Sequence, residues 1–248
     1  MTPSRRCAGW GASAAAEAVL DLLLPAGCAA CGEPAAGVLC AGCRARVIPV
    51  AGPACLRCGA PWTRHRRRGG CGRCRRFGRP FAFSTAVAPW RHRGPVRTAI
   101  HRFKYGGRAE LAVAFARELR LQPRVAACGA RARGEKSAAM VVVPVPPRRG
   151  SGRDDQAGRL AQALADGWRR PLARALRRRR EVPAQAGAPR QRRLQQVRGA
   201  FTATSGPIEG RAGLLVDDVL STGATADACA RALKRAGATT VRVVALAT

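Results

Sequence analysis

The sequence predicts an α/β protein, with a doubly wound, mainly parallel sheet that carries helices on both faces and follows a small N-terminal zinc-ribbon-like module. Two apolar runs, 139–145 and 214–216, have the composition of strands buried on both faces of a parallel sheet. Each is followed by a loop and then by a segment of helical composition, which is the order of elements in α/β folds. The first third of the chain instead carries closely spaced cysteine pairs.

Composition divides the 248 residues into three parts. Residues 1–24 are predicted to form an amphipathic helix or extension, residues 25–80 a cysteine-rich module, and residues 81–248 the α/β domain. The basic start of the chain imitates a signal peptide, but Glu17 and Asp21 interrupt the apolar stretch that follows. No run reaches the roughly 18–20 apolar residues that a membrane span needs. We therefore expect no membrane span and a cytoplasmic protein.

Within the α/β domain, apolar periodicity and turn residues predict the order of the elements. We expect strands at 81–89, 139–145, 214–216 and 240–247, and helices at 95–105, 109–119, 155–167 and 226–236. Residues 122–138 are polar and are predicted to be irregular. Ligands of doubly wound sheets bind where the carboxyl ends of the strands meet, so the loops that follow the strands are the places to seek a site.

Eight of the eleven cysteines form four C-x-x-C pairs. These pairs are Cys28/Cys31, Cys40/Cys43, Cys55/Cys58 and Cys71/Cys74. Two such pairs supply four thiolates to a tetrahedral zinc ion, so four pairs predict two structural zinc sites. Neighbouring pairs in sequence are the simpler partners, and a cross-braced arrangement is the alternative. A disulfide framework is the competing interpretation, but no secretion signal accompanies the cysteines. Cys7, Cys128 and Cys229 stand alone and are predicted to be unligated.

The formal net charge is +31, and only three of the 45 basic residues are lysines. Such an excess of arginine favours a nucleic acid or another polyanion as partner. A GC-rich genome would give the same composition without selection for binding. The run Arg64–Arg68 adjoins Trp62, which either stacks on a base or packs over the metal site. The Arg-, Pro- and Gln-rich segment 177–199 is a loop over the site, a polyanion contact or a solvated loop.

The stretch 213–225, GLLVDDVLSTGAT, carries the strongest chemical signal. Its apolar residues lead into Asp217 and Asp218, and a loop of small and hydroxyl-bearing residues follows at 221–225. Adjacent carboxylates at the end of a buried strand are costly unless a ligand such as a sugar diol or a magnesium ion engages them. The N–H groups and hydroxyls of the loop, with the start of the next helix, favour a phosphate. Read more plainly, the same residues would cap an ordinary helix.

This stretch resembles the phosphoribosyl pyrophosphate (PRPP) signature of type I phosphoribosyltransferases. The resemblance implies that Asp217 and Asp218 are the catalytic acids and hold the ribose hydroxyls. It implies that the 5′-phosphate binds in the loop of Ser221, Thr222, Gly223, Ala224 and Thr225. A second, basic loop would receive the pyrophosphate, with its magnesium, through Arg148 and Arg149. Lys104 either reaches the same anion or caps the C-terminus of its helix.

Further motifs extend the resemblance to the ComF family. They occur in one order along the chain: VLDLLLPAGCAACG, the four C-x-x-C pairs, HRFKYGG, VVVPVPPRRG, Gln156, RGAF and LLVDDVLSTGAT. The resemblance implies a zinc finger joined to a type I phosphoribosyltransferase-like domain and a role in DNA uptake during natural competence. It also implies single-stranded DNA and a helicase of the competence machinery as partners. The chain departs from the family at 152–156, where GRDDQ replaces RGFNQ, and at 193–201, where RLQQVRGAF replaces R-x-x-N-V-x-G-A-F.

Two functions follow as expectations. The first is a PRPP-binding, ComF-like protein that handles incoming single-stranded DNA. The alternative is a metabolic phosphoribosyltransferase that transfers ribose 5-phosphate from PRPP to a small nucleophile. No segment of the sequence clearly resembles a nucleobase-recognition hood, which favours the first function. The two functions differ in whether the protein catalyses transfer of ribose 5-phosphate from PRPP to an acceptor.

Overall fold

The structure is a computed structural model that describes residues 27–50, 54–55, 57–61, 71–78, 80–129, 140–147, 155–179, 197 and 199–248. Several sequence predictions fall outside these residues: the helix within 1–24, Cys7, the basic cluster beside Trp62, the pair Arg148 and Arg149, and most of 177–199. They stay predictions.

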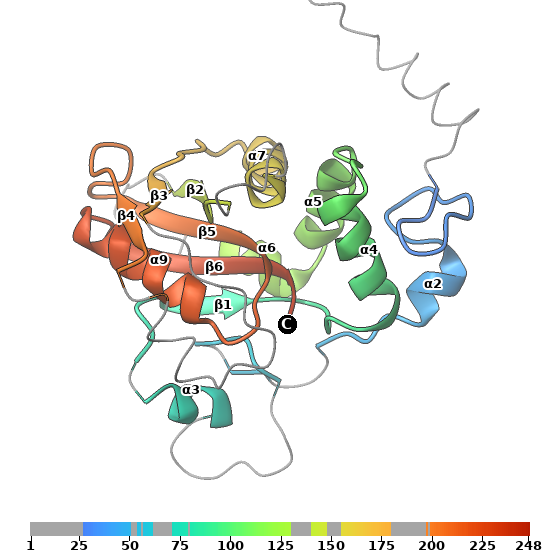
Figure 1. The fold of residues 1–248 in the computed structure, drawn as a ribbon, viewed down its shortest axis with the longest axis horizontal. Coiled ribbons are helices and arrows are strands. Elements are labelled where there is room, and N and C mark those ends of the chain that lie inside the picture. The colour runs from blue at the N-terminus through green and yellow to red at the C-terminus, as the bar shows by residue number, and fades with distance from the viewer. Residues whose placement is uncertain are drawn as a thin grey trace, which may run out of the picture.

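A four-stranded sheet lies at the centre of the described part of the chain (Figure 1). Its strands follow the order β1 (Thr85–Val87), β6 (Thr240–Ala247), β5 (Ala212–Val219) and β2 (Val141–Pro144). All of its pairings are parallel, as predicted. The strands are rich in valine, whose branched side chain favours an extended backbone, and most of their residues are buried. β1 is shorter than the strand expected at 81–89.

Alternate residues of the strands point to opposite faces of the sheet, and each face has its own core. Val142 and Leu214 belong to a core covered by α4 (Gly94–Tyr105), α5 (Leu111–Arg120), α6 (Pro123–Gly129) and α7 (Gln156–Trp168). Val143 and Leu215 belong to a second core covered by α9 (Ala224–Arg235). Helices therefore lie on both faces, and the doubly wound prediction is confirmed (Figure 1).

Two parts of the fold differ from the sequence prediction. Residues 123–129 were expected to be irregular and instead form α6, which buries Val125 and Cys128. A helix of 7 residues is too short for apolar periodicity to stand out. In addition, β3 (Leu176–Arg178) and β4 (Phe201–Ala203) form a separate antiparallel pair that was not predicted. Strands of 3 residues that pair across a long segment leave no local pattern in the sequence.

The first cysteine-bearing segment contains α2 (Ala41–Ala45) and packs beside α4 and α5 (Figure 1). Its Ala29 and Val38 belong to the core that these helices cover. Arg44 also forms an ion pair with Glu118 of α5, which adds a polar contact between this segment and that helix. This segment therefore buries its apolar residues against the sheet's helical layer.

The second cysteine-bearing segment contains α3 (Gly72–Phe77) and lies beneath β1 in the view of Figure 1. Its Cys58 and Phe77 belong to the other core, the one that α9 covers. The approach to the sheet is close, because a Cβ placed on Gly59 would lie 2.6 Å from the carbonyl oxygen of Ala86 in β1. The two segments thus contribute to the cores on opposite faces of the same sheet.

Candidate functional site

The two acids of the 213–225 stretch lie at the carboxyl end of β5, and both are half-buried. A carboxylate oxygen of Asp217 accepts a 2.9 Å hydrogen bond from the backbone N–H of Asp218. The carboxylate of Asp218 lies 2.7 Å from the ammonium group of Lys104, where the lysine side chain is 27% exposed and the aspartate side chain 20%. Different contacts therefore hold the two acids, and solvent still reaches both residues.

Asp217 is poised to change charge near neutral pH. Burial, followed by the neighbouring charge of Asp218, raises the pKa of Asp217 to about 7. The N–H group of Asp218 and the positive charges of Lys104 and Arg178 act in the opposite direction and are outweighed. Carboxyl groups perturbed in this way, next to a specific charged partner, are concentrated at functional sites.

The loop after β5 turns directly into α9. At its start, the N–H of Leu220 donates a 2.8 Å hydrogen bond to the carbonyl of Ala247, which continues the pairing with β6. At its end, Gly223 has φ = 80°, in the left-handed region that favours glycine, and α9 begins at the next residue. Between them, the hydroxyl of Thr222 accepts a 3.3 Å hydrogen bond from the N–H of Ala224. The loop therefore has a defined backbone shape.

The start of α9 offers hydrogen-bond donors to an anion. The first N–H groups of a helix have no carbonyl partner within it, and they carry the positive end of the helix dipole. The acid in the first turn of α9, Asp227, is engaged elsewhere. It is buried, accepts a 2.7 Å hydrogen bond from the N–H of Ala82 and forms an ion pair of 3.0 Å with Arg231. Its charge is thereby compensated by its own partners.

Lys104 and Gln156 bring two more elements to the acid pair. Lys104 lies in the last turn of α4, and its ammonium group reaches Asp218, as described above. The side-chain amide of Gln156, the first residue of α7, donates a 2.8 Å hydrogen bond to the carbonyl of Lys104. The ends of α4, α7 and β5 therefore meet at one place.

The preceding residue, Asp155, departs from the ComF pattern and has a structural role here. Its carboxylate caps α7 by accepting a 2.8 Å hydrogen bond from the N–H of Gly158, and it forms an ion pair with Arg174. An acid at this position therefore stabilises the start of α7.

Arg178 of β3 contacts the segment that leads into the second predicted loop, and no role was predicted for it from the sequence. Its guanidinium group donates hydrogen bonds of 3.2 Å to the carbonyl oxygens of both Pro146 and Pro147. It also lies 4.7 Å from the ring centre of Phe201 in β4. The two prolines lead into the predicted pyrophosphate loop, so Arg178 holds the start of that loop. No sequence signal indicates this contact, because it depends on the pairing of β3 with β4.

The eight paired cysteines form two groups, Cys28/Cys31/Cys40/Cys43 (cluster 1) and Cys55/Cys58/Cys71/Cys74 (cluster 2). Within each group, all sulfur atoms lie within 4.8 Å of one another. Three sulfur–sulfur distances are 3.6, 3.7 and 3.3 Å, close to the roughly 3.8 Å expected between thiolates of a tetrahedral zinc site with Zn–S bonds of about 2.3 Å. Both clusters therefore fit a structural zinc ion, and neighbouring pairs in sequence are the partners.

Cys128 and Cys229 lie outside both clusters and are buried. Burial raises the pKa of Cys128 to about 12 and raises that of Cys229 well above its usual range. Thiols held in the neutral form are weak metal ligands and weak nucleophiles, so both residues are core residues.

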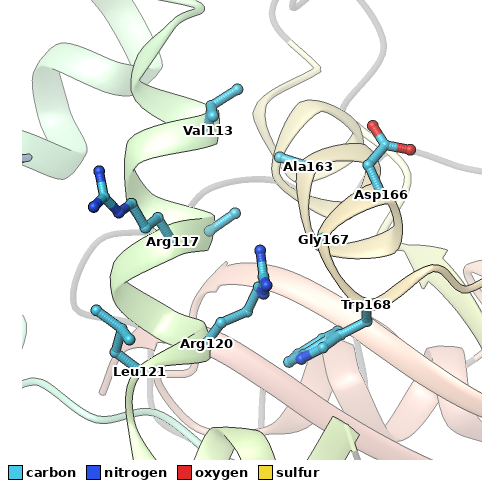
Figure 2. A pocket seen from close by; sticks show the side chains of 9 residues that line it. Val113, Arg117, Arg120, Leu121, Ala163, Asp166, Gly167 and Trp168 are labelled. Carbon is cyan, nitrogen blue, oxygen red and sulfur yellow. The ribbon is translucent and has the colours of Figure 1, made fainter.

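A groove of 770 Å³ lies between α5 and α7 (Figure 2). Its lining consists of Val113, Ala116, Arg117, Arg120, Leu121, Ala163, Asp166, Gly167 and Trp168. Arg120 of α5 and Trp168 of α7 lie opposite each other in Figure 2. None of the predicted site residues that the structure describes lines this groove. Among the described helices, none is long and apolar enough to cross a bilayer.

Comparison with known proteins assigns the cysteine-rich part. Residues 19–75 match the family described as a double zinc ribbon domain, and this range contains both cysteine clusters. No curated protein matches the chain. One similar solved structure is titled as that of the allosteric regulatory enzyme of purine biosynthesis; it is 20% identical, with a TM-score of 0.38. The similarity covers 59% of this chain and 30% of that one, so the chain spans under a third of that enzyme's length. The N-terminal part of this protein is thus similar to a double zinc ribbon and joins a mostly parallel α/β sheet.

Proposed function

We propose that this protein binds magnesium-PRPP at the carboxyl edge of its sheet. The observation that carries the proposal is the placement of Asp217 and Asp218 at the end of β5, beside a glycine-containing loop that opens α9. Acids suited to a sugar diol and donors suited to a phosphate are thereby placed on neighbouring segments. Lys104, which contacts Asp218, adds a positive charge to the same edge.

Each part of the ligand has a matching part of the site. Residues 221–225 would hold the 5′-phosphate through backbone N–H groups and hydroxyls. Asp217 and Asp218 would accept hydrogen bonds from the ribose hydroxyls. The loop that begins at Pro146 and Pro147, fixed by Arg178, would receive the pyrophosphate, with the adjacent arginines 148 and 149 as its partners. Magnesium would arrive with PRPP, neutralise pyrophosphate charge and accept carboxylate ligands readily.

If transfer takes place, a nucleophile forms a bond to C1 of the ribose as the bond from C1 to the pyrophosphate oxygen breaks. The pyrophosphate leaves with the electron pair, and the nucleophile releases its proton. The ribose carries positive charge in the transition state, and the carboxylates of Asp217 and Asp218 would stabilise that charge.

We further propose the ComF-like role, in which the PRPP-binding protein handles single-stranded DNA during DNA uptake. The net charge of +31 and the order of the ComF motifs support this role. The alternative is a metabolic phosphoribosyltransferase that acts on a small nucleophile. Release of pyrophosphate from PRPP in the presence of a defined acceptor would support the alternative.

The first test is calorimetric titration of magnesium-PRPP into the purified, zinc-loaded protein and into an Asp217→Asn/Asp218→Asn variant. We expect binding to the wild type and at least a tenfold loss in the variant, because the amides accept weaker hydrogen bonds and carry no charge. Asp166→Asn is the matched control, since Asp166 is exposed and lines the groove between α5 and α7. A well-folded wild type that does not bind magnesium-PRPP would contradict the proposal.

A further inference from the structure

We propose that cluster 2 supports the phosphate loop, and that Arg73 is the positioning residue that connects them. This inference rests on the proposed function, because the proposed function names a phosphate as the ligand of the loop at 221–225. Two separate sets of contacts run from α3 to this loop, one to Leu220 just before it and one to Gly223 within it.

The first set is a chain of hydrogen bonds through Arg73, which lies between two cysteines of cluster 2. The guanidinium group of Arg73 donates to the carbonyl of Cys58 at 3.3 Å and to the hydroxyl of Thr248 at 2.8 Å. The same hydroxyl donates a 2.9 Å hydrogen bond to the carbonyl of Leu220. A hydroxyl group can accept one hydrogen bond while it donates another, so the chain is chemically consistent. Leu220 is the residue immediately before the loop at 221–225.

The second set is a stack of aromatic rings. Phe77, the last residue of α3, lies with its ring centre 3.8 Å from that of Phe81, and Phe81 lies 4.6 Å from Phe83. Gly223 lies against the second and third of these rings, because a Cβ at this position would lie 3.0 Å from the Phe81 ring and 3.8 Å from the Phe83 ring. Gly223, just before α9, therefore packs against the Phe81 ring, which in turn packs against Phe77 of α3.

Support at Leu220 and at Gly223 fixes the loop before the ligand arrives. A phosphate loop works when its N–H groups already point at the anion, and binding is weaker when the ligand must order them. The short helix α3 carries Cys71 at its start and Cys74 within it, so its position depends on the zinc that these cysteines would hold. Cluster 1 packs against α5 through Arg44 and Glu118. Zinc in cluster 2 therefore has a consequence for PRPP affinity that acts through this loop.

The experiment compares Arg73→Ala and Thr248→Val with wild type by calorimetric titration of magnesium-PRPP. We expect each variant to bind about tenfold more weakly, because the ligand must then order the loop as it binds. The double variant should lose little more than either single variant, because both break the same chain. Arg73→Lys should restore part of the affinity, since it keeps the charge and one donor. Arg75→Ala is the matched control, because Arg75 is exposed on the same helix; it should bind like wild type.

Two further readouts separate positioning from loss of structure. Zinc content should stay at two ions per chain in all of these variants, and melting temperatures should stay close to that of the wild type. Hydrogen exchange of the ligand-free protein should be faster across residues 220–224 in Arg73→Ala and unchanged in Arg75→Ala. Unchanged exchange and unchanged affinity in Arg73→Ala would overturn the inference. If the wild type binds no PRPP, the proposed function fails, and the exchange comparison still decides whether cluster 2 supports the loop.

Discussion

At the scale of single residues, the site depends on two aspartates in sequence that have different surroundings. Asp218 is paired with Lys104 at 2.7 Å. Asp217 accepts a hydrogen bond from the next N–H group, and its pKa is raised to about 7 by burial and by the charge of Asp218. The neighbouring positive groups, Lys104 and Arg178, reduce this shift without cancelling it. One acid is thus held by an ion pair while the other is ready to lose a proton when a ligand binds.

This difference predicts that PRPP binding releases a proton. Between the ordinary pKa of an aspartate and about 7, Asp217 is protonated in the free folded protein, whereas a carboxylate that accepts bonds from ribose hydroxyls is ionised. Affinity should therefore fall as the pH is lowered through 7, and binding at pH 6.5 should release up to about one proton from this group. Calorimetry in buffers of different ionisation enthalpy measures that number.

Asp217→Asn provides the control, because PRPP phosphates titrate in the same range and their contribution remains in the variant. The wild type should release more protons than the variant. Equal proton release in the two proteins would show that Asp217 is already ionised or does not contact the ligand.

At the scale of elements, the connection from β5 to α9 is the part of the fold on which the proposed function depends. β5 is paired on both sides, with β2 and β6, so the end of this strand has a fixed position. The turn into α9 needs a left-handed residue next to a tightly packed ring, and Gly223 meets both needs. A glycine is therefore required here for conformation and for space.

Gly223→Ala should destabilise the protein and weaken PRPP binding. A left-handed conformation costs an alanine about 1–2 kcal/mol, and the new methyl group would meet the Phe81 ring at 3.0 Å. Thermal unfolding and calorimetric titration measure the two effects. Gly206→Ala is the matched control, because nothing lies within 4 Å of a Cβ at that position. A Gly223→Ala protein that is as stable as Gly206→Ala and binds PRPP equally well would contradict this account of the loop.

At the scale of the whole molecule, the two cysteine-bearing segments contribute to the cores on opposite faces of one sheet. Cluster 1 lies in the segment that packs with α4 and α5, and cluster 2 lies in the segment that packs with β1 and α9. The region similar to a double zinc ribbon thus packs into both cores of the α/β part. The second global property is the net charge of +31, which would attract a polyanion to the protein.

Single-stranded DNA binding should be strong at low salt and fall steeply as salt is added. For single strands, the logarithm of affinity falls with the logarithm of salt concentration by about 0.7 per phosphate contact. Replacing Arg66, Arg67 and Arg68 by alanine should therefore lower the slope by about 2 if all three bind phosphates. Fluorescence anisotropy with a labelled oligonucleotide measures this slope.

A second variant, in which Arg117, Arg120 and Arg124 are replaced by alanine, has the same net charge as the first triple variant. Comparison of the two tests whether the position of the arginines affects DNA binding. We expect it to bind DNA like the wild type. Equal effects of the two triple variants would mean that the charge acts only as a whole, and no binding by the wild type would contradict the single-stranded DNA proposal.

Much of this protein was determined by short stretches of its sequence. The parallel sheet followed from apolar runs without alternation, because a strand buried on both faces needs no polar side. The metal-binding residues followed from the C-x-x-C spacing, since two thiolates at that spacing converge on one ion. The acid pair and the loop that we propose binds a phosphate lie within thirteen consecutive residues, 213–225, so a local stretch of sequence was enough to predict both.

Only the tertiary structure decided which distant residues meet. It placed Lys104 against Asp218, Arg178 against the loop that starts at Pro146, and Arg73 between cluster 2 and the base of the phosphate loop. It also chose sequential pairing of the cysteine pairs over cross-bracing. The physical reason is common to all of these contacts. They join segments far apart in the chain, and packing of the whole core brings those segments together, which no local pattern of residues encodes.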